Sequence, residues 1–249
     1  MPKRIFITGA SSGIGFALAH EYAARGFDLI LTARRIDTLK SLRQEIIARH
    51  PERTVHAMAL DVTRVDDVFA SLAFDALAAA NIGTIDIVVA NSGIGSLGRV
   101  GHGDFGEQRK IIETNVIGAM ATCDAAIRLF KQQGFGQLVV MSSVAAFRGL
   151  PRSSAYGASK AAIATYAEAI RAEIYGTAVK VTTIFPGYID TPINRGVPSR
   201  PFVITVERGA KLIADKIDRG VATAVVPAFP WTLVKWIARF IPTRLIARR

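Results

Sequence analysis

The chain has 249 residues, of which 50% are hydrophobic and 20% charged, so it can build a large core and is not a disordered chain. Its formal net charge of +11 is compatible with a nucleic-acid, anionic-lipid or anionic-cofactor partner. A single cysteine cannot form an internal disulfide, and four scattered histidines do not match a zinc site, so we expect no metal. The N-terminus lacks the apolar stretch of a signal peptide, which predicts a cytoplasmic protein.

Short apolar runs rich in β-formers alternate with longer segments whose apolar residues recur at helical spacing. In chain order, we expect strands at 3–8, 28–33, 54–60, 85–91, 137–142, 179–185 and 222–227, and helices at 14–25, 36–49, 64–80, 104–132, 154–176 and 205–219. Several strand runs are apolar on both faces, which is typical of parallel strands covered by helices on two sides. The pattern predicts an α/β fold: a Rossmann-like, doubly wound parallel sheet of about seven strands in a single domain.

A glycine-rich turn joins the first expected strand to the first helix, in the run Thr-Gly-Ala-Ser-Ser-Gly-Ile-Gly that begins at Thr8. A turn of this kind offers backbone N–H groups and a helix N-terminus to the pyrophosphate of a dinucleotide. The spacing is Gly-x-x-x-Gly-x-Gly rather than Gly-x-Gly-x-x-Gly, and a tight turn without a ligand is the alternative. The candidate cofactor-binding residues here are Gly9, Ser11, Ser12, Gly13, Ile14 and Gly15.

The second expected strand ends in two arginines, Arg34 and Arg35. Near this point of a dinucleotide fold, an acid binds the ribose hydroxyls of NAD, whereas arginine suits the 2′-phosphate of NADP. We therefore expect NADP(H) as the cofactor, with both arginines as ligands. Asp37 follows shortly after, and we interpret it as a first-turn residue of the next helix. A solvated loop is the alternative interpretation of the arginines.

A serine and a tyrosine–lysine pair form the most specific pattern. Ser143 follows the fifth expected strand, while Tyr156 and Lys160 are four residues apart and share one face of a helix. An ammonium near the phenol favours the phenolate and lowers the tyrosine pKa, so Tyr156 can pass a proton in either direction. Ser143 would hydrogen-bond a substrate oxygen as charge develops on it. Taken alone, such a pair is also compatible with a solvated helix face.

Through these motifs, the sequence resembles the short-chain dehydrogenase/reductase family over about residues 3–227. Asn115, in Glu-Thr-Asn-Val, is similar to an asparagine that in the family holds a water linking the active-site lysine to solvent. The resemblance implies hydride transfer between a nicotinamide and a carbonyl or alcohol, and it implies a homo-oligomer. The catalytic residues it implies are Asn115, Ser143, Tyr156 and Lys160. Tyr156 and Lys160 would also contact the cofactor.

The same resemblance implies cofactor contacts in three further segments. They are Asp61 and Val62, Asn91, Ser92 and Gly93, and Pro186, Gly187, Ile189 and Thr191. The second segment departs from the family's Asn-Asn-Ala-Gly, because a serine replaces the second asparagine and the alanine is missing. Two alternatives stay open: Asp61 as a helix N-cap and Asn115 as a bridge between backbone groups. A dehydratase or epimerase that retains NAD fits the loop spacing and the arginines less well.

Two loops are expected to cover the substrate, at 145–151 and 193–204, and their apolar residues predict an apolar substrate.

We divide the chain into a dinucleotide-binding and catalytic domain, 1–229, and a basic amphipathic tail, 230–249. No acid follows Asp218, and the tail is too short and too charged to span a bilayer. It is interpreted either as a peripheral contact with the inner membrane surface or as a helix packed on the protein or on a second subunit. The rival to an enzyme is a non-catalytic module that binds a membrane or a nucleic acid. For the enzyme, we expect no nucleic-acid partner.

Overall fold

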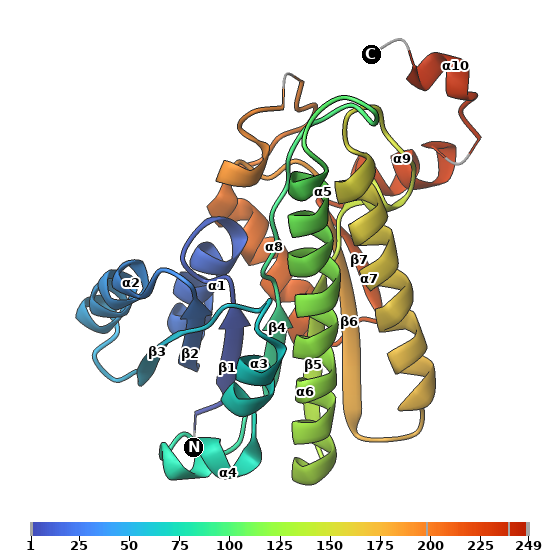
Figure 1. Cartoon of the computed structure of the whole chain (residues 1–249). Coiled ribbons are helices and arrows are strands. Elements are labelled where there is room, and N and C mark those ends of the chain that lie inside the picture. Colours follow the sequence, from blue (N-terminus) through green and yellow to red (C-terminus); the bar gives the residue numbers. More distant parts are fainter. Residues whose placement is uncertain (1, 198, 239, 248–249) are drawn as a thin grey trace.

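The computed structural model describes residues 2–197, 199–238 and 240–247, and these residues contain a seven-stranded parallel sheet (Figure 1). The strand order is β3-β2-β1-β4-β5-β6-β7, which confirms the doubly wound sheet. The strands are β1 (Arg4–Thr8), β2 (Asp28–Ala33), β3 (Val55–Ala59), β4 (Ile87–Ala90), β5 (Gly136–Met141), β6 (Val179–Pro186) and β7 (Thr223–Val226). The order reverses between β1 and β4, and ligands of such sheets bind beyond the carboxyl ends of the strands at that point.

Two helical layers cover the sheet, and the pleat of each strand assigns alternate residues to them. Ile5 and Ile7 of β1 join a core under one layer, whereas Phe6 joins the core under the other. The first layer contains α1 (Gly13–Ala24), α2 (Ile36–Arg49) and α8 (Val206–Asp218). The second contains α3 (Val65–Ser71), α4 (Phe74–Ala79), α6 (Ala119–Gln133) and α7 (Ser154–Glu173), and α5 (Phe105–Ile112) packs against α7.

Two of the expected helices are interrupted. The segment expected at 64–80 forms α3 and α4, because Leu77 would lie opposite Val68 on one straight helix, and the break returns both side chains to the core. The segment expected at 104–132 contains a π-helical turn, η1 (Glu113–Gly118), between α5 and α6. Asn115 lies buried inside this turn. π-Helical insertions are frequent at functional sites.

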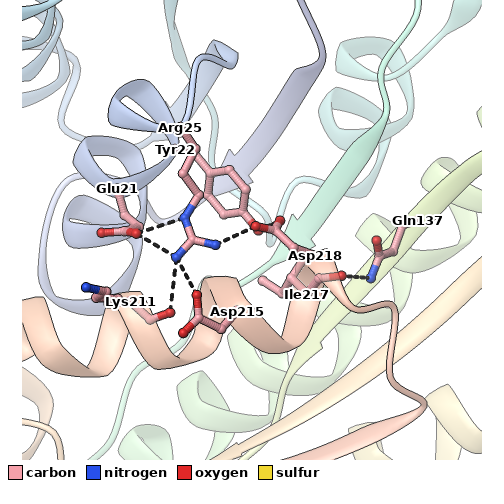
Figure 2. A network of polar contacts seen from close by, with 8 residues as sticks. All are labelled: Glu21, Tyr22, Arg25, Gln137, Lys211, Asp215, Ile217 and Asp218. Carbon is pink, nitrogen blue, oxygen red and sulfur yellow. Dashed lines mark hydrogen bonds and ion pairs between the residues drawn. The ribbon is translucent and has the colours of Figure 1, made fainter.

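Arg25 clamps α1 against α8 (Figure 2). Its guanidinium pairs with Glu21 at 2.6 Å, with Asp215 at 2.7 Å and with Asp218, and the Tyr22 hydroxyl donates to Asp218 at 3.2 Å. Burial, together with the Asp218 carboxylate, raises the pKa of Tyr22 far above its usual value, so the phenol stays protonated. Since α1 begins at the glycine turn, the clamp fixes the position of that turn relative to the β6–α8 side of the sheet.

The tail follows β7 as α9 (Trp231–Ala238) and α10 (Thr243–Ile246). Both helices lie at the carboxyl end of the sheet, the end that also carries the glycine turn (Figure 1). Short 3-10 turns, η2 (Val144–Ala146) and η3 (Pro192–Asn194), follow β5 and β6 at this same end. Within the described residues, none of the helices is long and apolar enough to cross a membrane.

Candidate active site

The glycine turn has the backbone that its sequence predicts. Gly9 and Gly13 have φ values of +67° and +58°, a region that favours glycine. A Cβ on Gly15 would lie 2.6 Å from the Gly9 carbonyl oxygen, so the backbone is packed too closely for a side chain. Ser12 is the N-cap of α1, and its side chain makes no capping hydrogen bond. The turn thus presents backbone N–H groups at the positive end of a helix dipole, an arrangement that binds phosphate.

Asn91 and Ser92 support the turn from the end of β4. The Thr8 hydroxyl oxygen accepts hydrogen bonds from the backbone N–H groups of Asn91 at 3.0 Å and Ser92 at 3.1 Å. The Asn91 amide donates in return to the Thr8 carbonyl at 2.9 Å. Ser92 therefore contributes to this contact through its backbone, which any residue supplies. This explains how a serine can stand where the family has asparagine.

The two arginines after β2 differ in their contacts. Both are exposed, but Arg35 donates to the carbonyl and the hydroxyl oxygen of Ser11 at 3.3 and 3.1 Å. The guanidinium of Arg35 therefore lies directly on the glycine turn. Asp37 lies in the first turn of α2, as the sequence predicts.

Asp61 and Val62 follow β3. The Asp61 carboxylate accepts from the backbone N–H and the hydroxyl of Thr63 at 3.0 and 2.8 Å, which is a local turn, and the N-cap of α3 is Arg64. Val62 is buried and packs on η1, where a Cβ on Gly118 would lie 2.7 Å from the Val62 carbonyl oxygen. This contact joins the β3 end of the site to the turn that carries Asn115.

Asn115 bridges the loop after β4 to α7. Its side-chain oxygen accepts from the Ile94 N–H at 2.8 Å, while its amide donates to the Ile94 carbonyl at 2.8 Å and to the Ser159 hydroxyl at 3.1 Å. Gly93 lies between Asn115 and Lys160, because a Cβ there would be 3.3 Å from the Asn115 oxygen and from the lysine Nζ. One interpretation of the sequence is that Asn115 bridges backbone groups. The structure shows this bridge, from the Asn115 side chain to both backbone groups of Ile94.

Tyr156 and Lys160 converge from one face of α7. The lysine Nζ lies 5.9 Å from the centroid of the phenol ring and donates to the Met141 carbonyl at 2.9 Å. Lys160 is 5% exposed, and burial lowers its pKa to about 8. Burial raises the pKa of Tyr156, against a smaller lowering by the Ser143 hydroxyl. The lowered tyrosine pKa expected from the sequence is therefore wrong for this structure, because desolvation of the phenolate outweighs the hydrogen bond from Ser143.

Ser143 faces the carboxyl end of β6. Its hydroxyl accepts from the Ala145 N–H at 3.2 Å and donates to the Pro186 carbonyl at 3.5 Å, a long contact that a better acceptor can replace. Beyond β6, Ile189 and Thr191 are buried, and a Cβ on Gly13 would lie 3.4 Å from the Thr191 side chain. The stretch 186–191, which begins with the last residue of β6, therefore contacts both Ser143 and the glycine turn.

Sequence reasoning missed the contribution of Trp231. This residue is 7% exposed, and its indole N–H has no hydrogen-bond acceptor among the described atoms. A Cβ on Gly187 would fall inside the indole, and the ring packs edge-on against Tyr188 and Phe202, with centroids 5.6 and 6.2 Å apart. The tail thus supports the segment after β6. The sequence offers one signal for this packing, which is the large aromatic residue Trp231 directly after Pro230 at the start of the tail.

The carboxyl end of the sheet therefore carries a dinucleotide-type turn together with a serine, tyrosine and lysine, an arrangement that defines a nicotinamide-dependent oxidoreductase fold. The short chain dehydrogenase family model matches residues 3–201. The chain belongs to this family.

Three similar proteins agree with this assignment. An uncharacterized oxidoreductase of Mycobacterium tuberculosis is 37% identical over 99% of this chain and 96% of its own length. A sulfoacetaldehyde reductase of Chromohalobacter salexigens is 35% identical over 88% and 82%. The crystal structure of an alcohol dehydrogenase from Thermococcus sibiricus, complexed with 5-hydroxy-NADP, superimposes with a TM-score of 0.81 at 27% identity, covering 90% of this chain and 96% of that one.

Proposed function

We propose that the protein is an NADP(H)-dependent reductase of aldehydes or ketones, with Tyr156 as the general acid in reduction and the general base in the reverse direction. One arrangement carries the proposal: Pro186, the last residue of β6, accepts from Ser143 at 3.5 Å, and Thr191, five residues later, lies against Gly13. A ligand that spans from the glycine turn to the serine would therefore pass along one continuous surface. A dinucleotide with its nicotinamide beside the serine has this extended shape.

The cofactor is held, in this proposal, at three places. The backbone N–H groups of the glycine turn bind the pyrophosphate, and the exposed Arg34 and Arg35 bind the 2′-phosphate. Gly93, Tyr156 and Lys160 adjoin the nicotinamide ribose. The positive φ of Gly9 and Gly13 and the tight contact at Gly15 fit this cofactor, because the turn leaves its N–H groups without a covering side chain. Asp61, Val62 and the segment after β6 complete the proposed contacts.

The proton chemistry follows from the burial of the site. When bound, the reduced nicotinamide supplies a hydride to the carbonyl carbon, and the carbonyl oxygen must then gain a proton. The raised pKa of Tyr156 keeps its phenol protonated at neutral pH, ready to donate that proton. Ser143 hydrogen-bonds the same oxygen as negative charge develops. The ammonium of Lys160 offsets the charge left on the phenolate. Asn115 holds the backbone at Ile94, beside Lys160, and in this proposal keeps open the path by which the phenol regains its proton.

The substrate is proposed to be apolar. The covering loops expose Ile193, Phe202 and Leu150, at 41%, 59% and 42%. A basic residue of the same region, Arg200, pairs with Asp190 at 2.6 Å, so it is already neutralised and does not select for an anion. The relatives named as an alcohol dehydrogenase and a sulfoacetaldehyde reductase support a carbonyl or alcohol as the reacting group.

The experiment is a screen of NADPH oxidation against aldehydes, ketones and acyl-chain carbonyls, read by the loss of NADPH absorbance. We expect turnover of at least one apolar carbonyl, and NADPH binding by fluorescence quenching that is tighter than NADH binding. A non-catalytic binding module would give no turnover above the protein-free rate with any carbonyl, and that result would overturn the proposal. A cytoplasmic location and a homo-oligomer stay predictions, and light scattering measures the second.

A further inference from the structure

The helix α9 is apolar on two opposite faces, only one of which is packed. Successive residues rotate by about 100° around a helix, so Leu233, Trp236 and Ile237 share the side opposite Trp231 and Lys235. Trp231 is buried, whereas Leu233, Trp236 and Ile237 are 55%, 63% and 48% exposed. We call these three exposed residues the bare face of α9. Exposed apolar residues of this size, gathered on one side of a helix, mark an interaction surface.

Several contacts hold α9 and the chain after it on the protein. Trp231 packs beneath Gly187, and the Lys235 Nζ lies 5.1 Å from the centroid of the Phe147 ring. Beyond α9, Arg148 donates to the Ile241 carbonyl at 3.1 Å. The packed side of the helix is therefore already engaged. The bare face is exposed on a helix that is held in place, and α9 lies at the carboxyl end of the sheet (Figure 1).

The charge of the surrounding chain indicates the partner. No Asp or Glu follows Asp218, so every charged side chain of the tail is positive. Two exposed phenylalanines flank α9 in the chain, since Phe229 before it and Phe240 after it are 81% and 80% exposed. The basic residues beyond α9 are Arg239, Arg244, Arg248 and Arg249. Aromatic and aliphatic side chains beside basic ones are the combination that binds anionic membrane surfaces.

We propose that the bare face of α9, with Phe229 and Phe240, binds the surface of an anionic lipid bilayer. A second copy of this chain fits less well, because a two-fold interface sets the same patch against itself and would bring two acid-free basic tails together. A nucleic acid would use the basic residues and leave the bare face exposed to water. The lipid surface accounts for both features.

The test is co-sedimentation of the full chain with vesicles of phosphatidylglycerol and phosphatidylcholine, compared with phosphatidylcholine alone. We expect binding to the mixed vesicles only, weakening as salt rises, since each basic residue near such a surface contributes about fivefold to the partition coefficient. Trp236→Ser should reduce binding at least tenfold. The matched control is Tyr175→Ser, because Tyr175 is an aromatic residue outside the tail and is 91% exposed. That control should bind like the unchanged chain.

A second readout uses the tryptophans, since the sequence contains only Trp231 and Trp236. On the mixed vesicles, a blue shift of the tryptophan emission is expected, and Trp236→Phe should remove it because Trp231 is already buried. Failure of the unchanged chain to sediment with the mixed vesicles would overturn the proposal. Equal binding to phosphatidylcholine alone would overturn the anionic requirement. Conversion of an oligomer to a monomer by Trp236→Ser, without vesicle binding, would assign the face to a subunit contact. None of these outcomes depends on catalytic activity.

Discussion

Replacing Trp231 by alanine should destabilise the protein strongly, although the residue lies in a C-terminal tail. The side chain is 7% exposed and packs on Gly187, Tyr188 and Phe202. Removing a buried tryptophan typically costs about 3–5 kcal/mol of unfolding free energy. The unpartnered indole N–H lowers this cost, because an unsatisfied buried donor is itself unfavourable by about 1–3 kcal/mol. The midpoints of these two ranges differ by about 2 kcal/mol, which is the net loss that we expect for Trp231→Ala.

Two further variants test whether the loss comes from the buried packing of Trp231. Trp231→Phe removes the unpartnered N–H and keeps a ring against Tyr188, so its loss should be about 1 kcal/mol or less. Trp236→Ala removes an indole that is 63% exposed, and such surface changes fall within about 0.5 kcal/mol. Urea unfolding followed by far-ultraviolet circular dichroism measures all three. If Trp231→Ala were as mild as Trp236→Ala, the packing of the tail against Gly187 would be wrong.

Three further predictions follow from the cofactor loop, the α1–α8 clamp and the buried lysine. NADPH should bind at least about tenfold tighter than NADH, about 1.4 kcal/mol, and Arg34→Asp should shrink or reverse that preference in a fluorescence titration; equal affinities in the unchanged chain would refute it. Arg25→Met should lower the urea-unfolding free energy by about 1–3 kcal/mol, since it leaves Asp215 and Asp218 without their shared cation, and an unchanged midpoint would contradict the clamp. The pKa of Lys160 is about 8 in the folded protein and near its usual 10.5 when unfolded, so the unfolded chain binds more protons between these values. Stability should therefore rise between pH 8 and 10, by up to about 1.4 kcal/mol per pH unit, relative to Lys160→Met; parallel pH profiles would be evidence against a buried lysine.

Most of the fold is predictable because buried parallel strands have a strong sequence signal. The run Ile87–Ala90 is apolar at every position, and the structure buries all of it. The glycine turn is predictable for a related reason, since Gly9 and Gly13 adopt a backbone that other residues avoid. In both places the local sequence contains the physical cause of the structure.

The interrupted helices and the tail were less predictable. The periodicity of 104–132 does not reveal the π-helical turn, because one extra residue in a turn hardly changes the apolar pattern around Asn115. On α9, both Trp231 and Trp236 are apolar, so the sequence alone could not tell which face packs. The pKa of Tyr156 depends on how deeply the fold buries the ring, which is a tertiary property. Each of these features is set by packing between segments distant in the sequence.

The central claim, that Tyr156 supplies the proton for carbonyl reduction, is tested most directly by the turnover of Tyr156→Phe with a carbonyl accepted by the unchanged chain. The substitution keeps the ring that packs on Gly95 and removes only the hydroxyl. The rate of NADPH oxidation should fall by about 10² or more, while fluorescence quenching shows NADPH bound with nearly unchanged affinity. A rate within a few-fold of the unchanged chain, with NADPH bound equally well, would contradict the assigned proton donor.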